Sequence, residues 1–293
     1  MAPDPAWNPS MRAPQRLHGL TLDTAVCAGP YPPQGFWTIA EGALGNGDCF
    51  GLYWPLGCEG KAPVVCEMFH DEGRLEFSHS SLDVFAQWLD INHALDEQAW
   101  DDEGWEPRAH DVPDVDSPLP LIERAQVHVQ AGKPSEAIEL LQAACRRFPE
   151  LQRAWMMLAV QHRRLGQHEA AVAAARAAIL ANWAFGIPDP SVLRLLRAAE
   201  AGNDPVLMMV QQMEFAFGGA KTNPDYASMQ VCIDRCWEAG DHLTALRLTQ
   251  NRCYALRGET VSFQQREGFD LASWQRDFVA QCRSALRDDR QGM

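Results

Sequence analysis

The sequence predicts two kinds of structure in one chain: a small α+β domain with an antiparallel sheet and a helix, followed by an all-α domain of helical-hairpin repeats. Short β-rich runs separated by glycine-containing turns fill the N-terminal part, and four glycines recur between helical patterns in the remainder. We therefore expect an α+β domain over residues 1–95, an acidic linker over residues 96–117 and a helical-repeat domain over residues 118–293.

The N-terminal domain is predicted from alternating patterns and turn residues. The expected elements are strands over residues 35–40, 49–54, 63–69 and 74–77 and a helix that begins near Leu82. The turn Gly45-Asn46-Gly47-Asp48 favours a hairpin, because Asn and Gly both tolerate positive φ. Apolar residues at Leu82, Phe85, Ala86 and Leu89 recur at the helical spacing and give that helix one apolar face.

Four glycines divide the C-terminal part into similar units. They are Gly132, Gly166, Gly202 and Gly240, and each follows one helical pattern and precedes another. A glycine at such a position lets the first helix end with positive φ without steric cost. A last helix beginning near Asp270 carries an apolar face that could cap the stack.

The residues around these glycines resemble the tetratricopeptide repeat. The second unit matches best, with Trp155, Leu158, Ala159, Gly166, Ala171 and Ala178 in the family's order of large and small residues. The resemblance is specific over residues 118–183 and weak over residues 191–257, where Leu195, Glu214, Ile233 and Arg252 replace small residues. It implies stacked hairpins and a role in protein–protein contact, or a scaffold for the first domain.

Charge is distributed unevenly. Residues 1–95 carry 11 acidic and 4 basic side chains, residues 96–116 carry 9 and 1, and residues 117–293 carry 19 and 20, so that the chain's net charge is −14. A nucleic-acid-binding protein is expected to present a basic face, and no such run is present. The acidic N-terminal part favours a basic protein partner, although it could serve solubility alone.

Composition excludes other classes. Hydrophobic residues make up 46 % of the chain, which excludes disorder through most of it, and no run approaches the roughly 20 apolar residues of a membrane span. The start lacks the features of a secretory signal, and nine cysteines without a C-x-x-C pair indicate reduced thiols. We expect a cytoplasmic protein.

The order of elements over residues 35–95 resembles the SUKH superfamily. The resemblance is carried by the Gly-Asn-Gly-Asp turn, the strand 64–69 that ends in Phe69 before His70-Asp71, and the helix with Phe85, Trp88 and Leu89. It implies an immunity protein that binds and neutralises a bacterial toxin of a contact-dependent or type VI secretion system, often a nuclease.

Catalytic and metal sites are not predicted. The chain has no G-x-S-x-G, Walker A or H-E-x-x-H motif. Cys232 and Cys236 share one helix face near His242, but a zinc site needs further ligands, so we expect buried thiols. We expect no enzyme activity and no cofactor.

These observations favour a toxin-binding immunity protein that occludes the active site of a cognate toxin. Acidic side chains would replace the toxin's polyanionic substrate, and two tryptophans would anchor the contact. The candidate partner-binding residues are Glu59, Asp71, Glu72, Trp100, Asp101, Asp102, Glu103 and Trp105. The alternative is an adaptor or secretion chaperone that binds a peptide or protein in the repeat groove; neither the partner nor the oligomeric state follows from the sequence.

Overall fold

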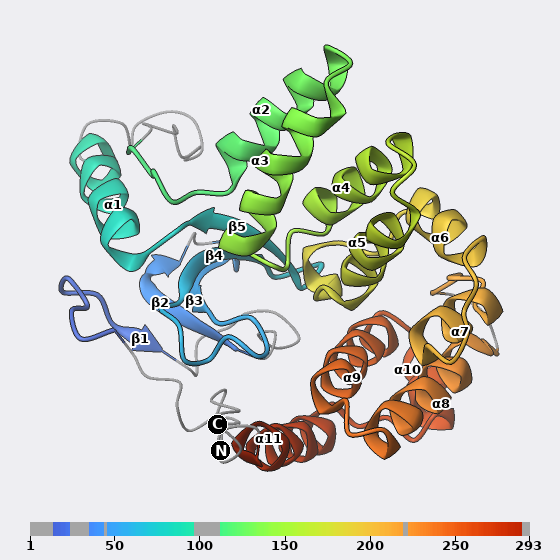
Figure 1. The fold of residues 1–293 in the computed structure, drawn as a ribbon. Coiled ribbons are helices and arrows are strands. Elements are labelled where there is room, and N and C mark those ends of the chain that lie inside the picture. Colours follow the sequence, from blue (N-terminus) through green and yellow to red (C-terminus); the bar gives the residue numbers. More distant parts are fainter. Residues whose placement is uncertain (1–13, 24–34, 44–45, 97–111, 219–221, 289–293) are drawn as a thin grey trace. The chain divides into compact units, whose positions relative to one another are not determined.

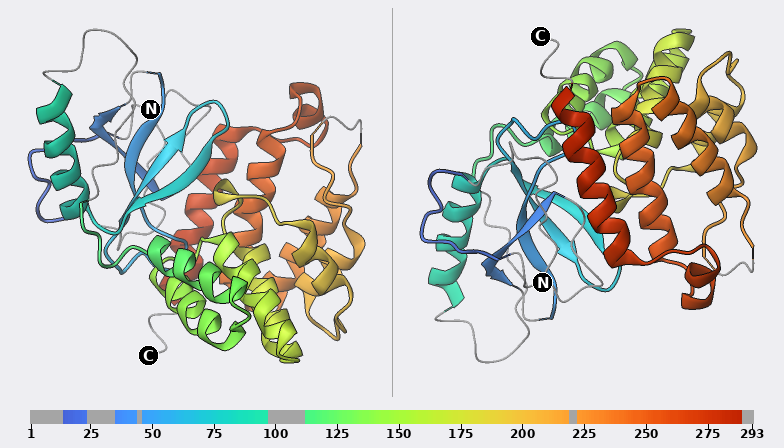
Figure 2. Two further views of the ribbon diagram at one scale, coloured as in Figure 1. Left: turned by 90° about the horizontal axis from the view of Figure 1, so that it is seen from above. Right: turned by 90° about the horizontal axis from the view of Figure 1, so that it is seen from below.

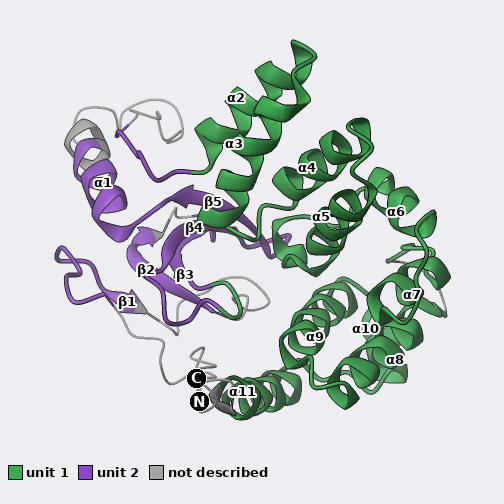
Figure 3. Ribbon diagram, viewed as in Figure 1, with its two compact units in different colours: residues 1–9, 55–57, 118–293 green, residues 10–54, 58–117 purple. Residues whose placement is uncertain are grey.

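The computed structural model describes residues 14–23, 35–43, 46–96, 112–218 and 222–288. The chain divides into two compact units, which Figure 3 shows in different colours. Unit 2 comprises Ser10–Trp54 and Cys58–Ser117, and unit 1 comprises chiefly Pro118–Met293 together with Pro55–Gly57.

Unit 2 is an antiparallel meander with one long helix (Figure 1). Its strands are β1 (Leu22–Asp23), β2 (Phe36–Ala43), β3 (Cys49–Tyr53), β4 (Val64–Phe69) and β5 (Arg74–His79), and each pairs with the next. The helix α1 (Leu82–Asp96) follows β5 and packs against β4 and β5. The expected sheet with its closing helix is thus confirmed, and the short β1 is an addition that the pattern did not predict.

Aromatic side chains hold α1 to the sheet. Phe50 on β3 lies with its ring centroid 5.1 Å from Phe85 and 5.5 Å from Trp88, both on α1. His79 at the end of β5 lies 5.5 and 5.4 Å from the same two rings. Aromatic pairs at these separations contribute packing area and about 0.5–1.5 kcal/mol beyond it. The apolar face predicted for this helix is therefore its packed face.

Unit 1 is a succession of helical hairpins. The helices are α2 (Leu119–Gln130), α3 (Pro134–Arg147), α4 (Gln152–Arg164), α5 (His168–Leu180), α6 (Pro190–Arg197), α7 (Pro205–Gln212), α8 (Asp225–Glu238) and α9 (His242–Arg257). A short 3₁₀ turn, η1 (Trp183–Phe185), follows α5. Helices pack within pairs and against the next pair along the chain, and buried apolar residues of all four hairpins form one core. This is how repeats bury faces that a single hairpin leaves open.

Three of the four repeating glycines, Gly132, Gly166 and Gly240, lie two residues after the first helix of their hairpin, as the sequence predicts. Gly202 instead lies in a separate turn, five residues after the last residue of α6. Gly132, Gly166, Gly202 and Gly240 have φ values of 71°, 71°, 52° and 75°. A side chain at such φ is strained, so glycine suits all four turns, and at Gly132, Gly166 and Gly240 it closes the preceding helix.

The third hairpin is shorter than its pattern suggests. Val206, Val210, Met213 and Phe217 have the spacing of one helix face, yet α7 ends at Gln212. The carboxylate of Asp225 accepts hydrogen bonds from the backbone of Glu214 (2.9 Å) and Phe215 (2.7 Å). These bonds replace helical ones and turn the chain towards α8.

Two helices complete unit 1. The helix α10 (Val261–Arg266) was not predicted, and α11 (Leu271–Asp288) is the expected last helix. α11 packs against α9, and the two helices lie side by side in Figure 2. Its side chains Phe278 and Cys282 are buried. Among the described residues, none of the helices combines the length and apolar character needed to cross a bilayer.

Candidate functional site

Two turns of unit 2 meet at one end of the sheet. Cys49 on β3 pairs with Met68 on β4, so the residue before β3 and the residues after β4 are neighbours. The residue before β3 is Asp48, and His70 and Asp71 follow β4. The sequence indicated both turns but not that their side chains bind one another.

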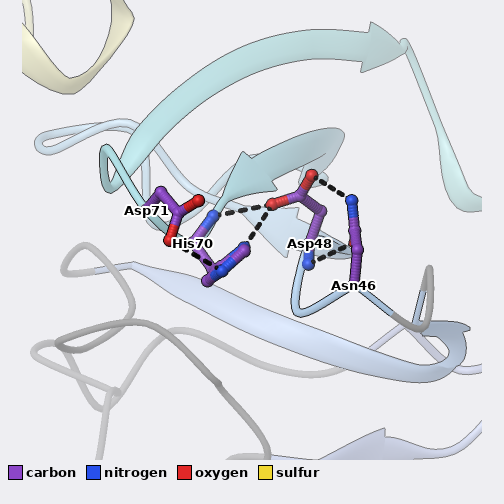
Figure 4. Close-up of polar contacts among 4 residues, drawn as sticks. All are labelled: Asn46, Asp48, His70 and Asp71. Carbon is purple, nitrogen blue, oxygen red and sulfur yellow. Dashed lines mark hydrogen bonds and ion pairs between the residues drawn. The ribbon is translucent and has the colours of Figure 1, made fainter.

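Asp48 and His70 form the centre of this site (Figure 4). Oδ1 of Asp48 accepts a hydrogen bond from the backbone N–H of His70 (2.8 Å) and lies 2.8 Å from Nδ1 of the same residue. Nε2 of His70 lies 2.8 Å from Oδ1 of Asp71. The imidazole ring therefore has a carboxylate oxygen beside each nitrogen. When both nitrogens carry a proton, the ring can donate a hydrogen bond to each of the two carboxylates.

Asn46 and Gly47 position the aspartate. The Asn46 side chain donates to Oδ2 of Asp48 and accepts from its backbone N–H, both at 2.9 Å. Gly47 has a φ of 104°, and a Cβ there would lie 2.9 Å from the His70 ring. Glycine is thus required both by the backbone conformation and by the close approach of the ring.

The surroundings shift the pKa of Asp48. Partial burial would raise it, but hydrogen bonds from His70 and Asn46 and the charge of His70 together hold the pKa of Asp48 below its ordinary value. The Asp48 carboxylate consequently stays ionised in mildly acidic solution. The bonds between Asp48 and His70, called the Asp48–His70 clamp below, therefore keep a charged acceptor.

Beyond the clamp lies an exposed set of carboxylates, the acidic turn surface, formed by Asp71, Glu72 and Glu76. Their side chains are 87 %, 65 % and 56 % exposed. Arg74 bonds to both Glu72 and Glu76 and holds its guanidinium 4.1 Å from the centre of the Phe69 ring. Arg74 thus orders two of the three carboxylates and leaves the acidic turn surface with more acidic than basic side chains.

Glu67 on β4 adds to the same negative field. It pairs with Glu76 across the β4–β5 ladder and is half-buried. Burial and then the charges of Glu76 and Asp48 raise the pKa of Glu67. Like charges placed side by side cost stability, which a cationic partner would relieve.

A second histidine lies in a more buried environment. His79 packs against both Phe85 and Trp88 of α1, with Nδ1 2.7 Å from the Ser78 hydroxyl. Burial lowers its pKa to about 4, against the opposing charge of Asp114. Asp114, near the end of the acidic linker, also binds the backbone N–H and hydroxyl of Ser80 and so joins this part of the linker to the residues that precede α1.

The structure separates the predicted partner-binding residues. Asp71 and Glu72 belong to the acidic turn surface. Glu59, between β3 and β4, is only 4 % exposed and so is not part of an exposed surface. Trp100, Asp101, Asp102, Glu103 and Trp105 lie outside the described residues. Sequence reasoning missed Glu67 and Glu76, which the strand register brings together, and Asp48 as a partner of His70.

The described residues contain no group of three or more His, Cys, Asp or Glu side chains placed to hold a metal ion. In the Asp48–His70–Asp71 set, two carboxylates flank one imidazole ring, and the bonds between Asp48 and His70 join the two turns.

A buried polar cluster in unit 1 joins the second hairpin to the fourth. Asn251 on α9 accepts a bond from Trp183 N–H (3.0 Å) and donates to the carbonyls of Ile179 (3.2 Å) and Ala181 (3.0 Å). The buried Glu150 accepts from the backbone of Asn182 at 2.6 Å. Burial raises the pKa of Glu150, although the charge of Arg247 and this bond oppose the shift.

An α+β unit followed by stacked helical hairpins defines a protein of the helical-repeat class, and a tetratricopeptide repeat model matches residues 122–187. Models of the YfbP N-terminal and C-terminal domains match residues 20–101 and 216–290. The chain is 39 % identical over 271 residues to the protein YfbP of Escherichia coli (strain K12), an alignment that covers 90 % of this chain and 93 % of that protein. The chain belongs to the YfbP family. The comparison with solved structures found no match.

These comparisons support the tetratricopeptide-like part of the sequence analysis. The family model over residues 20–101 is that of the YfbP N-terminal domain, so the SUKH resemblance stays a hypothesis.

Proposed function

We propose that this protein binds a basic protein partner through the acidic turn surface of unit 2. The observation that carries the proposal is the exposure of three carboxylates: Asp71 and Glu72 on the turn that the Asp48–His70 clamp holds in place, and Glu76 on the adjoining strand β5. Pre-ordered charge of one sign accelerates association with a partner of the opposite sign and selects against others.

The specific form of the proposal is immunity. The partner is then a cognate secreted toxin, such as a nuclease effector of a type VI or contact-dependent system, and the bound protein occludes its active site. Two features support this form: the excess of acidic residues before residue 117, and the SUKH-like order of residues 35–95. Carboxylates can occupy a cleft that evolved to bind phosphates.

The proposal is tested by affinity capture with the full chain as bait. The variant carries Asp71→Asn, Glu72→Gln and Glu76→Gln, which remove charge with little change in volume. We expect wild-type chain to retain a basic protein encoded beside its gene, and the variant to lose it.

A matched control removes three exposed charges from unit 1, with Glu136→Gln, Glu139→Gln and Glu169→Gln. This control should retain the partner as the wild type does. If all three baits recover the same proteins, or none recovers a basic partner, the proposed function is wrong.

A second candidate function is that of an adaptor, and the tetratricopeptide match over residues 122–187 favours it. Val127 on α2 is 64 % exposed within this stretch, so a bound peptide could contact it. In this case Val127→Glu should abolish capture while the acidic-turn variant retains it. Val261→Glu on α10, equally exposed at 69 %, is the control.

A further inference from the structure

The edge of the sheet that carries Glu76 of the acidic turn surface is open. Among the described strands, β5 is the last in the order β1-β2-β3-β4-β5, and it pairs with β4. Within the described part of the chain, Arg74, Leu75 and Glu76 form no backbone–backbone hydrogen bond outside this ladder. In an antiparallel strand, alternate residues direct both their N–H and their C=O groups away from the paired neighbour. β5 therefore presents backbone donors and acceptors that a further strand can bind.

The ladder between β4 and β5 is regular next to the acidic turn surface. Met68 pairs with Leu75, and Glu67 pairs with Glu76. The register shifts between Val65 and Cys66, towards the far end of β5. A strand added to the first half of β5 therefore continues a regular ladder. The opposite edge of the sheet is formed by β1, which is only two residues long.

The two faces of β5 differ in chemistry. Glu76 lies in one row with Glu67 and Phe50, because Glu67 pairs with both. On the opposite face, Leu75 and Phe77 are 1 % and 8 % exposed. Because side chains alternate between the faces of a strand, an added strand places every second side chain in the row of Glu76. Its remaining side chains lie on the face of Leu75 and Phe77.

The row that contains Glu76 favours a basic residue on an added strand. Glu67 and Glu76 lie directly opposite each other, and like charges in that position destabilise a ladder. Arg74 is bonded to Glu76, but it is also bonded to Glu72 in the turn. Opposite charges directly across a ladder stabilise it. A lysine or arginine across from Glu76 therefore complements this row.

We propose that the basic partner binds by adding an extended segment to the edge of β5, in which basic and apolar residues alternate. This inference rests on the proposed function, because it states how the same partner engages the acidic turn surface. The backbone of the segment bonds to the open edge, and its basic side chains lie beside Glu76. Its apolar side chains lie on the face of Leu75 and Phe77. Strand addition gains affinity from main-chain hydrogen bonds and specificity from alternate side chains.

The test measures binding of the full chain to a short, end-blocked, fluorescent peptide that alternates lysine and valine. Two further peptides carry backbone N-methyl groups, one on every lysine and the other on every valine. Only alternate N–H groups of an added strand face β5. We therefore expect one methylated peptide to bind at least about tenfold more weakly than the parent peptide, and the other to bind as the parent does. A contact made by charge alone gives the two methylated peptides the same affinity.

Two measurements on the chain place the peptide at β5. Glu76→Gln should weaken binding of the parent peptide by about two- to fivefold, as expected for one cross-strand pair of opposite charge. Glu139→Gln, at an exposed site on α3, is the matched control and should leave the affinity unchanged. In amide exchange on the wild-type chain, bound peptide should slow exchange in β5 and leave β1 unaffected.

Equal affinities of the two methylated peptides, or unchanged amide exchange in β5, would overturn the inference. Partner capture separates this failure from failure of the proposed function. If the acidic-turn variant loses a basic partner that the wild type retains, the proposed function stands even when the inference fails. If no basic partner is captured while only one methylated peptide binds, strand addition at β5 is supported and the proposed function is contradicted.

Discussion

The Asp48–His70 contact shows that a residue's partners depend on its three-dimensional surroundings as well as on its type. The sequence predicted a turn at residues 45–48 from its glycines and Asn46, and it left residues 70–73 between two expected strands, 63–69 and 74–77. It could not predict that Asp48 bonds to both the backbone and the ring of His70, because that contact depends on the register of β3 on β4. Residue type gave the turns, and tertiary pairing gave the site.

Replacing Gly47 by alanine should destabilise unit 2. The new Cβ would lie 2.9 Å from the His70 ring, and the alanine would have to adopt a φ of 104°. Strain of this kind costs about 1–3 kcal/mol. Gly132→Ala is the control: its φ is 71°, but nothing lies within 4 Å of the added carbon. Urea unfolding of both variants measures the difference, and equal losses would show that the ring contact contributes nothing.

His79 should make stability depend on pH. Its folded pKa of about 4 lies below the unfolded value of 6.5, so the unfolded chain binds the proton more tightly. The stability that the neutral His79 contributes to the folded state is fully present above pH 6.5 and is lost as the pH falls towards 4. At pH 5 the loss in unfolding free energy amounts to up to about 2 kcal/mol.

The imidazole resonance of His79 should therefore titrate near pH 4 in an NMR experiment. His79→Gln should flatten the decline in unfolding free energy between pH 7 and pH 5, whereas His168→Gln at an exposed site should leave it unchanged. A midpoint near 6.5 for His79 would contradict the assignment.

At the scale of helices and strands, the spacing of glycines and apolar residues predicted most of the elements that the structure contains. The hairpin glycines, the apolar face of α1 and the last helix were all visible in the spacing of residues. The end of α7 was not, because Asp225, thirteen residues after Gln212, binds the backbone of Glu214 and Phe215. The spacing of apolar residues does not indicate when a distant side chain will bind backbone groups that would otherwise continue a helix.

Asn251 provides a test of the contact between the second and fourth hairpins. Asn251→Leu should destabilise unit 1 by about 2–4 kcal/mol, because the Trp183 N–H and the Ala181 carbonyl lose their buried partner, while the Ile179 carbonyl keeps only its bond from the Trp183 indole N–H. Gln211→Ala is the control, since it removes one exposed hydrogen bond to Ala199. Thermal unfolding measures both; a loss for Asn251→Leu no larger than that of the control would show that the three bonds do not secure α9.

At the scale of the whole molecule, composition predicted the separation of charge from the repeats. The acidic excess lies before residue 117, and the helical hairpins that follow are nearly neutral. The sequence could name acidic residues but could not tell exposed from buried ones, as Asp71 and Glu59 show. The proposed contact with a basic partner therefore rests on exposed residues, the three carboxylates of the acidic turn surface.

The most direct test of this assignment is the association rate constant of the captured partner with the full chain, measured against ionic strength. For the wild type we predict a rate that falls about tenfold or more between 50 and 500 mM salt, as expected for electrostatic steering. The Asp71→Asn, Glu72→Gln, Glu76→Gln variant should associate slowly at every salt concentration. A rate that is insensitive to both salt and these substitutions would contradict the account.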